Sequence, residues 1–191
     1  LSGMLTEDTK VTTGVGNHQM FAAQYLISLK PKTFLTSGGY GTMGFAVPTA
    51  IGAHYANPQD TIIAIDGDGS LLMNLGELFT IGKYQLPVKI LLLNNHGDCM
   101  VRNIQDLLYG GAHVGTKKIT DINFAHVAQE MGFVYSRRIE KGDELKQGLE
   151  DFVSAEGASF LEVVTDVDEM LYPRIPAGLG YKDMILGPHM E

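Results

Sequence analysis

The chain has 191 residues, of which 45% are hydrophobic and 19% are charged, and its formal net charge at pH 7 is −8. These proportions are ordinary for a globular α/β domain with a substantial core. The negative charge argues against nucleic acid and an anionic membrane surface as partners. The single cysteine, Cys99, excludes an internal disulfide and favours a reducing compartment, so we expect a cytoplasmic protein, or an organellar one in a eukaryote. No apolar run reaches the length of about 18 residues that predicts a membrane span.

Short β-rich runs alternate with longer helical stretches along the chain. This alternation predicts an α/β fold, with a doubly wound, mostly parallel six-stranded sheet and helices on both faces. The expected strands are residues 10–13, 33–36, 61–65, 88–93, 133–137 and 160–165. The expected helices are residues 17–29, 43–55, 74–84, 123–131 and 143–152. Asn74, Asn123 and Asp143 are expected near the first turns of the last three, as helix capping predicts.

Three stretches read as irregular structure. Residues 37–44 are too rich in glycine for a helix or strand, which indicates a loop whose backbone lies close to a ligand or to other backbone. Residues 96–120 are expected to form a long loop, and a loop of that length in a compact domain is usually functional or mobile. From Asp166 onward the chain is expected to be extended and to wrap around the domain. We therefore predict one binding domain over residues 1–165 and a C-terminal tail over residues 166–191, on or near the active site.

Two polar motifs follow neighbouring predicted strands. Gly67-Asp68-Gly69-Ser70 ends one apolar run, and Asn94-Asn95 ends the next. Parallel strands would bring the carboxylate and the carboxamide to one edge of the sheet. Hard oxygen ligands beside closely approaching backbone N–H groups are what a Mg2+–diphosphate needs. The alternative is an ordinary turn in which Asp68 hydrogen-bonds only its own backbone.

The spacing of further residues favours the diphosphate. Ile51-Gly52, Pro58 and the run 63–66 precede the first motif at fixed distances, and the blocks 15–20, 36–44 and 166–173 extend the pattern. Together they resemble the C-terminal, diphosphate-binding domain of thiamine diphosphate enzymes. Within these enzymes the chain is most similar to the acetolactate (acetohydroxyacid) synthase large subunit.

The resemblance implies the roles of individual residues. The side chains of Asp68 and Asn95 and the carbonyl of Gly97 would hold Mg2+. The cofactor-binding set implied by the family comprises Asn17, His18, Gly41, Met43, Gly67, Asp68, Gly69, Ser70, Asn95 and Met100. For His18, a surface histidine before a helix is the alternative.

Two methionines would position the reacting part of the cofactor. Met43 matches the bulky apolar residue beneath the thiazolium ring, although a core methionine would look the same, and Met100 lies near the reacting carbon with Val101. Cys99 and Ile104 depart from the family pattern where it usually has glycine and an aromatic residue. Because both positions border the substrate channel in the family, these departures leave the identity of the acceptor substrate undetermined. Cys99 has no His or acid partner at a spacing that would predict a nucleophile.

The implied reaction belongs to branched-chain amino acid biosynthesis. Pyruvate is decarboxylated, and its hydroxyethyl unit is transferred to a second 2-keto acid. The glutamate that activates the cofactor lies in a pyrimidine-binding domain, and FAD in a central domain, and neither has a counterpart in this sequence. We therefore expect a partner pyrimidine-binding domain or subunit, a dimer or larger homo- or hetero-oligomer, and inactivity of this chain alone. A regulatory subunit is a further family partner.

Two other functions remain open from the sequence. One is a split-subunit thiamine diphosphate decarboxylase that resembles the β chain of sulfopyruvate decarboxylase. The other is a non-catalytic module for cofactor binding and dimerisation. The tail block 166–173 argues against the first, and a turnover assay would separate the second from an enzyme.

Overall fold

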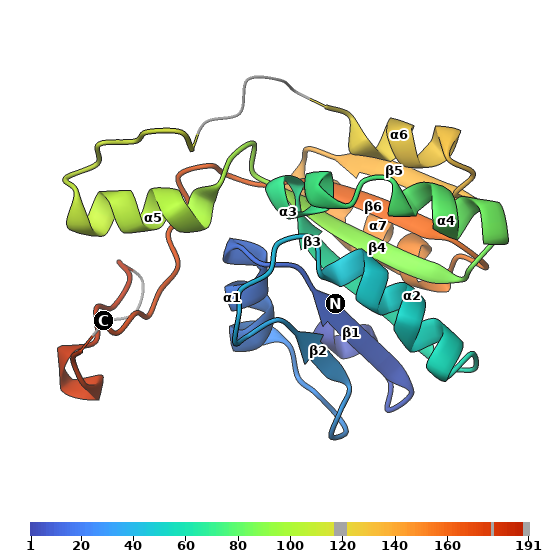
Figure 1. The fold of residues 1–191 in the computed structure, drawn as a ribbon, viewed down its shortest axis with the longest axis horizontal. Helices are drawn as coiled ribbons and strands as arrows, with labels where there is room; N and C mark the ends of the chain where they lie inside the picture. Colours follow the sequence, from blue (N-terminus) through green and yellow to red (C-terminus); the bar gives the residue numbers. More distant parts are fainter. Residues whose placement is uncertain (117–121, 177, 189–191) are drawn as a thin grey trace.

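A parallel sheet forms the centre of the molecule in the computed structural model, which describes residues 1–116, 122–176 and 178–188 (Figure 1). The strand order is β2-β1-β3-β4-β6-β5, and every neighbouring pair is parallel. The strands are β1 (Thr9–Thr13), β2 (Phe34–Thr36), β3 (Thr61–Gly67), β4 (Val88–Asn94), β5 (Tyr135–Ile139) and β6 (Ser159–Val164). The predicted fold class and all six strands are confirmed, with strand ends displaced by at most two residues.

Helices cover both faces of this sheet. They are α1 (Asn17–Tyr25), α2 (Ala46–Ala56), α3 (Asp68–Met73), α4 (Glu77–Tyr84), α5 (Cys99–Leu108), α6 (Phe124–Glu130) and α7 (Leu145–Ser154). Three short 3-10 turns, η1 (Ser2–Met4), η2 (Gly142–Glu144) and η3 (Tyr181–Asp183), complete the regular structure of the described ranges. None of the helices in these ranges is long and apolar enough to span a membrane.

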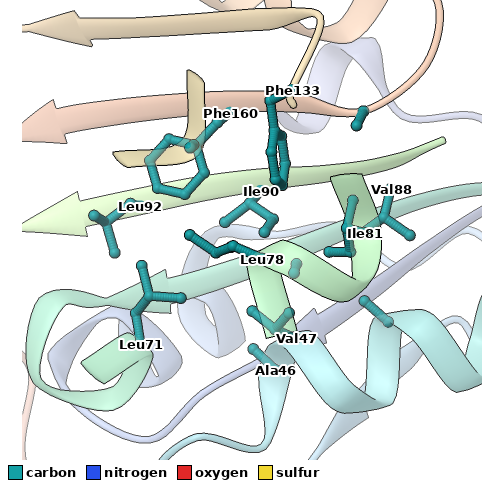
Figure 2. Packing of buried hydrophobic residues seen from close by; sticks show 14 of the residues in the cluster. Ala46, Val47, Leu71, Leu78, Ile81, Val88, Ile90, Leu92, Phe133 and Phe160 are labelled. Carbon is teal, nitrogen blue, oxygen red and sulfur yellow. The ribbon is translucent and has the colours of Figure 1, made fainter. Parts of the chain in front are cut away.

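The core divides into two layers because the central strands are apolar on both faces. On β3, Ile62 and Ala64 pack with α2, α4 and α6, whereas Ile63 and Ile65 face α1 and α7. Figure 2 shows the first layer, where Phe160, Ile90 and Leu92 of the strands meet Leu78 of α4. A strand buried on both faces reads as a continuous apolar run, which is why these strands could be predicted.

Several predicted helix boundaries were wrong. The helix expected over residues 74–84 begins at Glu77 as α4, and a separate helix that was not predicted, α3, precedes it. Asn74 lies between the two helices, and its side-chain Nδ2 donates to the carbonyl of Gly44 at 2.7 Å. The second predicted helix begins at Ala46 rather than Met43, so Met43 lies in the preceding loop. Of the three predicted polar starts, Asn123 is a side-chain cap: its Oδ1 accepts from the N–H of His126 at 2.8 Å.

The prediction of a loop over residues 96–120 was also wrong in part. Cys99–Leu108 forms α5, a helix whose buried residues are Cys99 and Asn103, and which projects away from the sheet in Figure 1. Glycines further along the segment, not the residues of α5, had suggested a loop. Residues 117–120 of the predicted loop lie outside the described residues.

The C-terminal segment leaves the end of β6 and runs past α5 (Figure 1). Arg102 of α5 forms an ion pair with Asp168, and the N–H of Leu171 donates to Asn103 Oδ1 at 3.1 Å. The segment contains η3 and an antiparallel bridge between Arg174 and Ile185. The tail is thus largely extended and attached to α5, while the division at residue 165 stays a prediction.

Candidate functional site

The strand order creates a switch point between β1 and β3. From β1 the chain moves outward to β2 and then returns to β3 on the other side of β1. Ligands of open α/β sheets bind outside the carboxyl ends of the strands at such a point. The pairings of Thr13 with Ile65 and of Gly67 with Leu93 bring the ends of β1, β3 and β4 to this one edge.

A cleft of about 220 Å³ lies at this edge. Four segments that are distant in the sequence line it: the start of α1, the glycine-rich loop before α2, the turn from β3 into α3, and the turn from β4 into α5. Every residue predicted to bind the cofactor or metal lines this cleft, namely Asn17, His18, Gly41, Met43, Gly67, Asp68, Gly69, Ser70, Asn95, Gly97 and Met100. Their shared location is a finding, and their individual roles stay predictions.

The structure distinguishes the two asparagines at the end of β4. Asn94 is buried, with its Nδ2 donating to Glu162 Oε1 at 2.7 Å and its Oδ1 accepting from the N–H of His96 at 3.1 Å. Both polar ends of Asn94 are therefore used inside the protein. Asn95 lines the cleft instead, as the predicted metal ligand should.

The two aspartates of the other turn differ in the same way. Asp66 is fully buried, and its Oδ1 accepts from the N–H of Gly67 at 3.0 Å. Burial raises the pKa of the Asp66 carboxyl to about 7, and the hydrogen bond from Ser70 opposes that rise. Asp68, two residues later, opens α3 and lines the cleft.

His18 contributes a neutral ring to the cleft. Burial lowers the pKa of its imidazole to about 4, so the ring carries no charge near neutral pH. Its Nε2 lies 3.5 Å from Asp66 Oδ1. The surface-histidine alternative was wrong, because His18 is only 6% exposed. At this position an uncharged imidazole can offer a hydrogen bond to an anion, but not a positive charge.

Two glycines of the β3–α3 turn leave no room for a side chain. A Cβ atom at Gly67 would lie 2.4 Å from His18 Nδ1, and one at Gly69 would lie 2.5 Å from Asp98 Oδ1. A side chain at either position would therefore displace a residue that lines the cleft. Met43 also reaches this turn, because its Cε would lie 3.3 Å from a Cβ at Gly69.

Comparison with known proteins agrees with this arrangement. Residues 14–163 match the family described as thiamine pyrophosphate enzyme, C-terminal TPP binding domain. The chain belongs to the thiamine pyrophosphate enzyme family. Thiamine pyrophosphate is another name for thiamine diphosphate, so the predicted resemblance to this family and its binding domain is confirmed.

Similar members of the thiamine pyrophosphate enzyme family are acetolactate synthases. The chain is 38% identical to acetolactate synthase isozyme 2 large subunit of Escherichia coli, over 97% of this chain and 34% of that protein. It is 43% identical to the mitochondrial acetolactate synthase catalytic subunit of Saccharomyces cerevisiae, over 95% of this chain and 26% of that protein. The chain thus spans about a quarter to a third of the length of these relatives.

The cleft suits the cofactor of thiamine pyrophosphate enzymes. Asn17 Oδ1 is buried without a hydrogen-bond partner among the described residues, and Asn17 lines the cleft. A buried polar atom without a partner costs about 1–3 kcal/mol, so a ligand that satisfies it would bind more tightly. Asn17 Oδ1 is an acceptor, so it would need a donor group of the ligand, whereas backbone N–H groups of the cleft suit the oxygens of the diphosphate end.

The oxygen donors suit a hard cation. Within the described parts of the chain, no three or more His, Cys, Asp and Glu side chains group to hold a metal ion. The predicted set instead combines one carboxylate, from Asp68, with the amide of Asn95 and the carbonyl of Gly97. Such oxygen donors suit Mg2+, which keeps several water or phosphate ligands of its own.

Two residues of the cleft have properties that the sequence did not show. Asp98 adds a second carboxylate to the lining, and the only signal for it was its place directly after Gly97. Cys99 is 3% exposed, and burial with the nearby Asp68 carboxylate raises the pKa of its thiol to about 11. A thiol of that pKa stays protonated, which agrees with the prediction that Cys99 is not a nucleophile.

Proposed function

We propose that the chain is the thiamine diphosphate- and Mg2+-binding part of an acetolactate-synthase-like enzyme. The complete enzyme decarboxylates pyruvate and transfers the hydroxyethyl unit to a second 2-keto acid. The observation that carries this proposal is the convergence of four distant segments, with every predicted binding residue, on one cleft. The similarity to acetolactate synthases supports the reaction.

The polar end of the cleft would hold the metal and the diphosphate. The side chains of Asp68 and Asn95 and the carbonyl of Gly97 would hold Mg2+, which would neutralise charge on the diphosphate. The backbone N–H groups of Gly69 and Ser70 would donate hydrogen bonds to the diphosphate. Asn17 and His18, which open α1 and line the same cleft, would also contact the diphosphate.

The remaining residues orient the cofactor and keep water away from it. Met43, which reaches the β3–α3 turn, would support the thiazolium ring, and Gly41 would leave room for the aminopyrimidine. Met100 would contribute to the part of the cleft that holds the reacting carbon. When bound, the cofactor supplies the electron sink for decarboxylation. The apolar side chains of the two methionines would exclude water from the reacting centre.

The rest of the active site would come from outside these residues. This proposal includes an activating glutamate from a pyrimidine-binding domain and FAD in a central domain. It also includes association into a dimer or larger oligomer, and a regulatory subunit. The relatives are three to four times longer than the segment that matches, which leaves room for such domains in them.

Calorimetry with thiamine diphosphate and Mg2+ tests the binding role. Asp68→Ala should abolish Mg2+-dependent binding, and Asn95→Ala should weaken it, because each removes one metal ligand. Asp143→Ala, an exposed carboxylate in η2, is the matched control and should bind like the wild type. Unchanged affinity in Asp68→Ala would refute the metal assignment.

A turnover assay tests whether this chain lacks part of the site. With Mg2+, thiamine diphosphate and pyruvate, the chain alone should form no acetolactate. Addition of a pyrimidine-binding partner should restore the reaction. Acetolactate from the chain alone would show that no partner domain is needed.

A further inference from the structure

Glu162 is a fully buried carboxylate behind the cleft, and no predicted role uses it. It lies on β6 and pairs with Leu92 of β4 and Arg138 of β5. Phe160, two residues earlier on β6, and Leu92, its partner on β4, belong to the apolar core. A buried carboxylate is stable only where hydrogen bonds or opposite charges satisfy it.

Three elements satisfy this carboxylate. Glu162 Oε1 accepts from Asn94 Nδ2 at 2.7 Å and from Arg138 Nη1 at 3.2 Å. Its Oε2 accepts from the N–H of Ala125, in the first turn of α6, at 3.1 Å. Glu162 thus joins the end of β4 to β5 and α6.

The bond to Asn94 reaches the turn that carries two predicted metal ligands. Asn94 Oδ1 accepts from the N–H of His96, which has a φ of 56°. A residue other than glycine is seldom stable in this left-handed conformation without a local hydrogen bond. The contact therefore holds the backbone between Asn95 and Gly97 in its observed form.

We infer that Glu162 and Asn94 are positioning residues for the metal site. Glu162 fixes the carboxamide of Asn94, and Asn94 fixes the turn that presents the Asn95 side chain and the Gly97 carbonyl. Neither positioning residue lines the cleft. Partners behind metal ligands act in this way when they fix ligand orientation. The inference rests on the proposed Mg2+ role of Asn95 and Gly97.

The first measurement is the Mg2+ dependence of thiamine diphosphate binding, by calorimetry on the 191-residue chain. Glu162→Gln replaces one acceptor by a donor, so either Asn94 or Ala125 loses its partner. We expect the apparent affinity for Mg2+ to fall about 10- to 100-fold, the range for lost partners behind metal ligands. Asn94→Ala should give a loss of similar size.

A double-mutant cycle separates positioning from a general loss of stability. If Glu162 acts through Asn94, the variant with both substitutions should bind Mg2+ about as weakly as Asn94→Ala alone. Fully additive losses would overturn the inference, because they would show that Glu162 acts by another route.

Lys89, at the opposite end of the β4–β6 strand pair, offers a control for a general loss of stability. Lys89 pairs with Ser159 at the start of β4, is 7% exposed, and donates to the carbonyl of Ala155 at 2.6 Å. Lys89→Met should lower thermal stability while leaving the Mg2+ affinity unchanged. Equal losses of Mg2+ affinity in Lys89→Met and Glu162→Gln would contradict a specific role for Glu162.

The wild type distinguishes failure of this inference from failure of the proposed function. No Mg2+-dependent binding in the wild type would overturn the proposed function and this inference with it. Normal binding in the wild type with unchanged Mg2+ affinity in folded Glu162→Gln would overturn the positioning role alone.

Discussion

The hydroxyl oxygen of Ser70 accepts a hydrogen bond from the N–H of Gly44 at 2.9 Å, across 26 residues of sequence. This buried contact ties the glycine-rich loop before α2 to the turn that follows β3. Asn74 adds a second tie, to the carbonyl of the same glycine. Met43 directly precedes Gly44, so the position of Met43 over the turn depends on the contacts of Gly44 with Ser70 and Asn74.

Ser70→Ala should therefore both destabilise the fold and loosen the loop. The buried N–H of Gly44 would lose its partner, which costs about 1–3 kcal/mol in the free energy of unfolding. Urea denaturation measures this loss. Ser154→Ala, which removes an exposed hydroxyl at the end of α7, should change the stability by less than about 0.5 kcal/mol. Equal effects of the two substitutions would show that the Ser70 contact does not contribute.

Substitution by alanine should lower the stability at one helical glycine and raise it at another. A Cβ at Gly82 of α4 would lie 1.7 Å from the carbonyl oxygen of Met131, so Gly82→Ala must push α4 away from that backbone. Gly52 of α2 has open space around it, and Gly52→Ala should raise helix stability by about 0.5–1 kcal/mol. Thermal melts of both variants test this, and a higher melting temperature for Gly82→Ala would contradict the close approach.

His96 should tolerate glycine better than alanine. Its φ of 56° is costly for any residue with a Cβ, by about 1–2 kcal/mol, and nearly free for glycine. His96→Gly should therefore be more stable than His96→Ala by about 1 kcal/mol. Chemical denaturation of the two variants gives the comparison, and the reverse order would mean that the turn is not left-handed at this residue.

Lys89 should make stability depend on alkaline pH. Burial lowers the pKa of its ammonium below the ordinary value of 10.5, so between these two values the unfolded chain binds more protons than the folded one. Stability therefore rises with pH across that window. The difference in unfolding free energy between wild type and Lys89→Met should shift in favour of the wild type from about pH 7 to about pH 10. A constant difference would contradict the pKa shift.

The sheet and the cleft could be predicted because their signals are local. Each central strand is an uninterrupted apolar run, and each polar motif follows a strand directly, so parallel pairing was enough to bring Asp68 and Asn95 to one edge. Helix α5 was missed although Met100, Ile104 and Leu107 follow a helical period. The glycines that follow α5, Gly110, Gly111 and Gly115, led to the prediction of a loop over the whole segment.

The supporting contacts could not be predicted. The family resemblance singled out Asn95, but nothing in the sequence placed Asn94 against Glu162, a contact that depends on the alternation of side chains along β4. Likewise, the bond from Gly44 to Ser70 needs the packing of two segments that are remote in sequence. Residue types locate a site, whereas the hydrogen bonds behind it depend on tertiary structure.

The support of the β4–α5 turn by Glu162 also has a kinetic consequence. A turn that is already in its binding conformation needs no slow rearrangement when a ligand arrives. Association of Mg2+ and thiamine diphosphate at this turn should then proceed in a single phase whose rate rises linearly with ligand concentration. In Asn94→Ala, where the turn must first be ordered, the rate should level off at high concentration.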